Sequence, residues 1–271
     1  MSGQSTQTTH VPCRMSRIHA RAFVRPMRGR SHPCLLRCEN EFYYVVKSHS
    51  RSRHSRICAN EMLADQLALI LGLPVRDPAA VEVPRALGGE VHGAFGSSET
   101  FNLEFGSCFP SPPHEMLVVD LLPDQLLRKV TNSAEAFLGG FVFDLWIQNC
   151  GRREIIFTRP AREEGTPYSA WLIDHDACFN DGEWNLPESF APCPYTRRSV
   201  YETAIHPDPF EPFLSRIENL GAREIEDAAR CVPPEWCGSN PRDIFDLADR
   251  LFRRRKQIRQ AAVNALLKAL H

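Results

Sequence analysis

The strongest constraint on the fold is a short apolar strand that ends in a lysine and is followed by a helix. The alternating pattern of EFYYVVK predicts a strand over 41–47 with Lys47 as its last residue. The next apolar segment, 57–73, repeats at helical spacing and predicts a helix with Glu61 near its start. These two side chains can form an ion pair. The alternative is an exposed lysine and a glutamate that interacts with the helix dipole.

Hydrophobic patterns predict further elements on both sides of this unit. We expect strands at 19–27, 33–38, 78–87, 90–98, 153–159 and 168–176, and helices at 133–149, 208–220, 222–232 and 240–270. Asn240 and Pro241 are typical of the cap and first position of that last helix. The glycines, serines and prolines of 95–115 predict a loop-rich connection.

Strands with one lysine, a helix with one glutamate, a connector and a mainly helical remainder follow the order of a kinase-like fold. We therefore predict an α+β protein of two lobes, a small β-rich lobe over 18–100 and a larger, mainly helical lobe over 116–271. The connector would span 101–115. Residues 1–17, which contain no hydrophobic periodicity, are predicted to form a disordered tail.

The charges balance over the chain but not along it. The formal net charge is −1, which argues against general nucleic-acid binding. Residues 1–60 nevertheless hold 11 Lys or Arg and 2 Asp or Glu, against 21 and 31 in the remainder. This asymmetry suits a cleft that binds a polyanion with a metal, and it equally suits two lobes that attract each other.

The remaining composition bears on location. No segment approaches the roughly 18 apolar residues that a membrane span needs, so we expect no membrane insertion. The first residues lack the apolar centre of a secretory signal. The 10 cysteines include no C-x-x-C pair, which disfavours zinc. We therefore expect a cytoplasmic protein with reduced thiols.

Two segments could bind a phosphate and its metal. The turn MRGRSH places Arg28 and Ser31 beside one glycine, where they can approach a phosphate, although a plain hairpin turn fits the pattern equally well. Asp174 follows the apolar WLI at a strand end, and Mg²⁺ prefers a carboxylate together with phosphate oxygens and water. The alternative for Asp174 is a turn residue that caps the strand.

Seven motifs in order make a more specific pattern. VVK, NEMLADQLALILGLPV, FGS, DLLP, FDLWIQN, REIIF and LIDHDACF resemble the HipA-like kinase family, in particular its compact bacterial branch with a D-x-W-x-x-N-x-D-x-R core. The resemblance runs from about Met27 to the terminal RRRKQI helix. It implies a protein-kinase-like fold related to the Ser/Thr kinases of toxin–antitoxin systems, with ATP and Mg²⁺ as cofactors.

The resemblance also implies roles for single residues. Lys47 would contact the ATP phosphates and Glu61 would orient it. Asp174 would bind the metal, and Asn149 would be a polar member of the catalytic loop. The chain departs from the pattern two residues after Asn149, where Gly151 occupies the place of the catalytic aspartate.

The missing carboxylate leaves three functions open. The first is a protein that binds Mg²⁺–ATP with impaired phosphotransfer, because a positioned base typically contributes about 10² to 10⁴-fold. The second is a pseudokinase that holds a protein partner through the basic loop 48–56 or the terminal helix. The third is an active kinase with a protein substrate, in which Asp176 or the more distant Asp144 replaces the base. The basic run RLFRRRKQIR is expected to be a solvated helix face.

Overall fold

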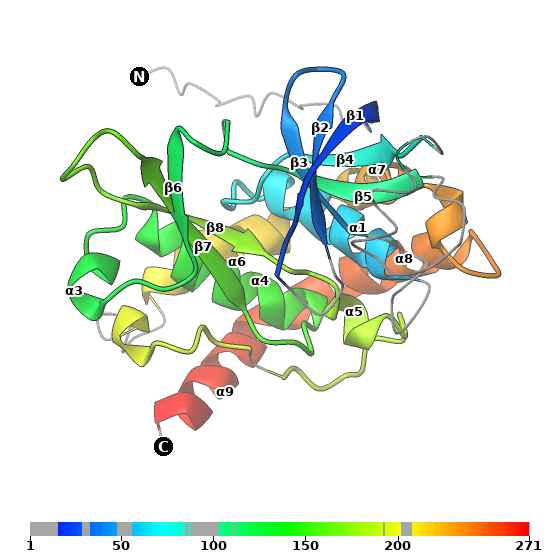
Figure 1. Ribbon diagram of the computed structural model, residues 1–271. Coiled ribbons are helices and arrows are strands. Elements are labelled where there is room, and N and C mark those ends of the chain that lie inside the picture. The colour runs from blue at the N-terminus through cyan, green and yellow to red at the C-terminus, as the bar shows by residue number, and fades with distance from the viewer. Residues whose placement is uncertain are drawn as a thin grey trace, which may run out of the picture.

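The computed structural model describes residues 16–28, 33–47, 56–84, 87, 103–110, 112–191, 193–201 and 208–270. Five strands form a closed barrel in the order β1-β2-β3-β5-β4, and three more form a sheet in the order β6-β7-β8. Figure 1 shows the barrel beside the sheet, with most of the helices below and behind them. The chain is thus a mixed helix and strand protein, as its patterns predict.

The barrel contains the predicted strand with the lysine. Its strands are β1 (Arg17–Pro26), β2 (Cys34–Cys38), β3 (Tyr43–Lys47), β4 (Pro78–Glu82) and β5 (Leu103–Cys108). The barrel closes because β1 pairs in parallel with β4, Arg17 opposite Ala80. The helix α1 (Ile57–Ile70) connects β3 to β4 and ends before Gly72, whose φ of 68° only glycine adopts readily.

Strand β5 corrects a prediction, because it lies within the segment 95–115 that was expected to be loop-rich. The reason is Gly106. A Cβ atom at this position would lie 2.5 Å from Cγ2 of Val81, so the glycine permits a close approach of β5 to β4 and does not break the strand. Strand β1 also begins inside the predicted tail, and the strand expected at 90–98 lies outside the described residues.

The rest of the chain is mainly helical around a small antiparallel sheet. Its strands are β6 (Met116–Val119), β7 (Glu154–Pro160) and β8 (Ser169–Ile173). Its helices are α3 (Asp124–Leu127), α4 (Gly140–Ile147), α5 (Cys178–Asp181), α6 (Glu211–Asn219), α7 (Ala222–Arg230), α8 (Asp243–Arg254) and α9 (Ile258–Leu270). All residues of α4 are buried, and it contacts α6, α8 and α9. The residues 134–139 before α4 form a π-helical segment.

Two predictions about the C-terminal region are only partly right. The helix expected over 240–270 is interrupted by a 3₁₀ turn at 255–257. It begins at Asp243, with Arg242 and not Asn240 in the cap position, and the Asn240 side chain accepts from the backbone N–H of Arg242 in the preceding turn. The basic run is not wholly a solvated face. Arg254 is buried, and its guanidinium donates to the carbonyl of Trp146 at 3.0 Å.

The buried apolar residues form two clusters. One fills the barrel, and the other is larger and joins α1 to the helices of the second half. The indole N–H of Trp236 also donates to the carbonyl of Leu103 in β5 at 2.8 Å. The barrel and the helical half are therefore packed together through α1 and β5. Within the described residues, no helix is long and apolar enough to cross a membrane.

Candidate active site

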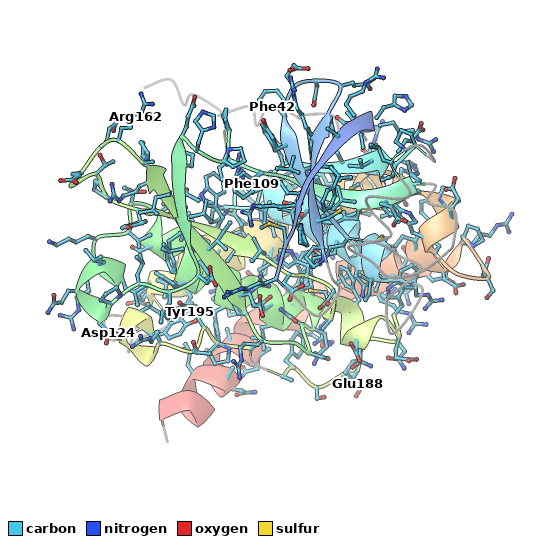
Figure 2. The ribbon with its side chains drawn as sticks, in the orientation of Figure 1. Phe42, Phe109, Asp124, Arg162, Glu188 and Tyr195 are labelled. Carbon is cyan, nitrogen blue, oxygen red and sulfur yellow. The ribbon has the colours of Figure 1, made fainter. Side chains whose placement is uncertain are left out.

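A cavity of about 920 Å³ lies between the barrel and the three-stranded sheet. Strands β1, β3 and β5 and helix α1 line one side, and β7 and β8 line the other. Figure 2 labels two lining residues, Phe109 in the upper part of the view and Tyr195 in the lower part. The cavity is of the size that small-molecule ligands occupy in proteins. Part of it is apolar, with side chains from Val45, Phe105, Phe109, Ile156 and Leu172.

The charged part of the cavity is centred on Lys47. The β3 strand ends at this residue, and its ammonium donates to a carboxylate oxygen of Glu61 and, at 2.5 Å, to Oδ1 of Asp174. Burial alone would lower the pKa of Lys47. The three carboxylates around it, including Asp176, outweigh burial and raise this pKa, so the ammonium stays charged.

Glu61 is 2% exposed and lies one turn into α1. Burial raises the pKa of Glu61 to about 7, against the opposing effect of the Lys47 charge. The negative charges of Asp174 and Asp176 contribute to this rise in the pKa. One cation thus faces three carboxylates, an excess of negative charge that a divalent cation would neutralise.

The raised pKa of Glu61 leads to a prediction about stability. The folded chain holds this proton up to pH about 7, whereas an unperturbed glutamate loses it near 4.5. Because the folded state binds more protons in this window, the free energy of unfolding should fall by about 1 to 3 kcal/mol as the pH rises through it. Glu61→Gln should lack this fall in urea titrations at about pH 5 and about pH 7. Equal pH slopes in the two proteins would contradict the shift.

Asp174 and Asp176 follow the end of β8. Asp174 follows the last strand residue, Ile173, and adopts a left-handed backbone with φ of 62°. Such a conformation is uncommon outside glycine and is found where a side chain is held for function. Both carboxylates line the cavity. They are the ligand type that Mg²⁺ prefers, so this pair could hold a magnesium ion beside Lys47.

A buried network supports the loop that precedes β7. Asp144 in α4 is fully buried, and both of its oxygens accept from the guanidinium of Arg153, at 2.7 Å for Nε. Asn149 donates to Asp144 at 3.0 Å and accepts from the backbone N–H of Gly151 at 2.9 Å. Arg153 also donates to the carbonyl of Ile173 at 3.0 Å. The network therefore connects α4, the loop and the end of β8, and it holds the residue before Asp174.

Comparison with known proteins bears on the family and the fold. The model of the HipA-like kinase family matches residues 21–266. The chain belongs to the HipA-like kinase family. Among solved structures, the Helicobacter pylori proinflammatory kinase CtkA aligns with a TM-score of 0.58 and 15% identity, covering 95% of this chain and 100% of CtkA. The Golgi casein kinase aligns with a TM-score of 0.50 and 11% identity, covering 93% and 73%. These similarities show a kinase-like fold. No curated protein matches the chain.

In this HipA-like kinase, the structure brings Lys47, Glu61, Asp174 and Asp176 together on one cavity. Arg28 also lines it and is exposed, whereas Ser31 and most of the basic loop 48–56 lie outside the described residues. Asn149 is buried and does not line the cavity; its side chain supports the loop.

Gly151 lies beside the segment that carries Asp176. A Cβ atom there would lie 3.1 Å from Cβ of Ala177 and 3.2 Å from Oδ1 of Asn149. The neighbouring N–H of Cys150 donates to the carbonyl of Ala177 at 3.0 Å. A side chain at 151 would therefore require these neighbours to move by a few tenths of an ångström. Asp176, one residue before Ala177, supplies a carboxylate to the cavity.

His175 is a site residue that the sequence reasoning missed. It is fully buried, and its Nε2 lies 3.2 Å from the Arg153 guanidinium. Its Nδ1 lies 2.9 Å from Oδ1 of Asp65, one helical turn after Glu61, although that contact does not have hydrogen-bond geometry. Burial, together with the charges of Arg153 and Lys47, lowers the pKa of His175 and keeps it neutral. In the sequence, a histidine between two aspartates in a turn forms no pattern that would indicate a buried side chain in contact with Arg153 and Asp65.

The side chains of Glu61, Asp65 and His175 are close enough for a metal, with possible ligand atoms within 4.8 Å of one another. The hydrogen bonding of His175 argues against this. Arg153 can only donate, so Nε2 must accept, and a neutral imidazole then carries its proton on Nδ1. The nitrogen that faces the two carboxylates therefore has no lone pair for a metal. The cluster of Glu61, Asp65 and His175 therefore joins α1 to the segment of Asp174.

Proposed function

We propose that this HipA-like kinase binds Mg²⁺–ATP in the cavity, between a small β-rich lobe and a larger, mainly helical lobe. The observation that carries the proposal is the ammonium of Lys47, held between Glu61 and Asp174 at the charged part of the cavity. A buried lysine fixed in this way presents its charge to phosphate oxygens. Asp174, with Asp176, would hold the magnesium ion, which neutralises phosphate charge when bound.

The remainder of the cavity suits the rest of the nucleotide. The apolar side chains of Val45, Phe105 and Leu172 provide surfaces on which a flat base can pack. Arg28, exposed at the cavity, can approach the phosphates from the barrel side. Charged and apolar groups thus occur in one cavity, as a nucleotide with a metal requires.

Phosphotransfer from this site would be slow. The position where the family pattern has its catalytic aspartate holds Gly151, so no base stands there to accept the proton of an attacking hydroxyl. Loss of a general base typically costs about 10² to 10⁴-fold in rate and leaves nucleotide binding intact. A second candidate is an active Ser/Thr kinase that uses Asp176. It is favoured by the place of this carboxylate on the cavity, beside the position of Gly151.

The test is calorimetric titration with ATP, with and without Mg²⁺. We expect metal-dependent binding that Lys47→Ala weakens at least about tenfold, because the phosphates lose their buried cation. Lys129→Ala is the matched control, since Lys129 is exposed and lies outside the cavity. If the native chain does not bind near millimolar ATP, equivalent to about −4 kcal/mol, the protein is a pseudokinase whose function lies in a protein partner.

A further inference from the structure

Three hydroxyl side chains line the cavity among the described residues, and they differ in their freedom to react. Ser107 is part of β5 and pairs with Val45 and Pro78 in the barrel. Tyr195 is 5% exposed, and its ring packs against two phenylalanines of the helical half. Thr196 is exposed and belongs to neither a helix nor a strand. It is therefore the hydroxyl that can move toward a bound nucleotide with least disruption.

The segment of Thr196 is attached to the loop that the family uses for catalysis. The thiol of Cys193 donates to the carbonyl of Gly151 at 2.9 Å. Cys193 and Thr196 are three residues apart, so their Cα atoms lie within about 11 Å of each other even if the chain is fully extended. Thr196 thus lies on the same cavity as Asp174 and Asp176, in a segment that contacts the loop of Gly151.

Positive charge lies close to this hydroxyl. Arg152 follows Gly151, is exposed and lines the same cavity as Thr196. Arg197 is the next residue after Thr196, and it forms an exposed ion pair with Asp124 at 3.2 Å. A phosphate on Thr196 could accept charge-assisted hydrogen bonds from either guanidinium, which would order the segment against the loop.

We propose that Thr196 is the acceptor of an intramolecular phosphoryl transfer by this chain, an inference that rests on the proposed binding of Mg²⁺–ATP. The Oγ atom of Thr196 attacks the γ-phosphorus of ATP, and a new P–O bond forms. The bond between that phosphorus and the oxygen bridging to the β-phosphate breaks, and ADP leaves. The hydroxyl proton passes to solvent water, because Gly151 stands where the family pattern has its base. The products are ADP and phosphothreonine.

An intramolecular acceptor makes transfer feasible although Gly151 lacks a carboxylate. The missing base costs about 10² to 10⁴-fold in rate. A hydroxyl on the same chain needs no encounter with a second molecule, and well-oriented intramolecular groups reach effective concentrations of about 10⁵ to 10⁸ M, which can offset that loss once Thr196 has moved to the nucleotide. An acceptor in free solution has no such advantage. The site therefore modifies its own segment more readily than a separate protein.

The experiment starts from the full chain treated with phosphatase, which is removed before Mg²⁺–ATP is added. Intact mass and peptide mapping should show one phosphoryl group on Thr196, and its rate should not depend on protein concentration. Thr196→Val should lose the modification, and Thr196→Ser should retain it. Thr131→Val is the matched control, because Thr131 is exposed but lines a different, smaller cavity. Asp174→Ala should abolish the modification, which excludes a contaminating kinase.

The outcomes separate this inference from the proposal on which it rests. A chain that binds Mg²⁺–ATP by calorimetry but gains no phosphate, or gains it elsewhere, including on the serines of 48–56, overturns the role of Thr196 alone. A rate proportional to protein concentration overturns the intramolecular step. Absence of nucleotide binding overturns the proposed function and this inference together.

Discussion

Asp144→Ala should lower the free energy of unfolding by about 3 to 5 kcal/mol. The Arg153 guanidinium is 2% exposed, and removal of Asp144 would leave its charge in the protein interior without a carboxylate. The same change removes the acceptor of the Asn149 amide. Burial makes each of these losses costly, because water cannot replace the missing partner.

The comparison that tests this expectation is an exposed pair of the same chemistry. Asp124 and Arg197 are 3.2 Å apart, with 49% and 39% of their side chains exposed. Asp124→Ala should therefore cost no more than about 1 kcal/mol. Urea unfolding followed by tryptophan fluorescence would measure both variants, since Trp146 is fully buried. Similar losses in the two variants would show that the buried network does not stabilise the fold.

The Asp144 network also explains why the loop can persist without a catalytic carboxylate. Arg153 contacts the carbonyl of Ile173 and the ring of His175, the residues on either side of Asp174. The groups that keep the segment of Asp174 in place are therefore the same groups that stabilise the core. Selection for a stable protein would retain this geometry even if phosphotransfer were slow.

The sequence predicted the features that depend on local patterns. Alternation identified β3, and helical spacing identified α1, which left an ion pair of Lys47 with Glu61 as one of two alternatives. The structure has this ion pair. The order of the motifs predicted the HipA-like kinase family, which the family comparison confirms. For β3 and α1 the signal lies within a few consecutive residues, because the spacing of the apolar side chains indicates the conformation of the backbone.

The features that depend on distant contacts could not be predicted in the same way. Closure of the barrel requires β1 to pair with β4, and the role of Gly106 as a point of close approach appears only when Val81 is beside it. The ion pair of Asp144 with Arg153 joins residues whose local patterns indicate a buried helix and a strand end. Partners of this kind are determined by packing, so a local pattern cannot distinguish them from ordinary polar residues.

Gly151→Asp should raise the rate of phosphotransfer by about 10² to 10⁴-fold, the contribution of a positioned general base. The backbone at Gly151 is not in the left-handed region, so an aspartate is not strained there by its φ. Its Cβ would be 3.1 Å from Cβ of Ala177, and the neighbouring loop must move by a few tenths of an ångström. That adjustment is small compared with the expected gain.

Two matched variants isolate the carboxylate in this experiment. Gly151→Asn has nearly the same shape without the charge, and Gly151→Ala reproduces the contact with Ala177 alone. Phosphate incorporation from saturating Mg²⁺–ATP should rise in the Asp variant and not in the other two.

If Asp176 already serves as the base, Gly151→Asp should give little gain, and Asp176→Asn should abolish the transfer of the native chain. An equal rate in Gly151→Asp and Gly151→Asn, with transfer unaffected by Asp176→Asn, would mean that neither carboxylate limits the reaction. The site would then be one whose rate depends on holding the hydroxyl and the phosphate together.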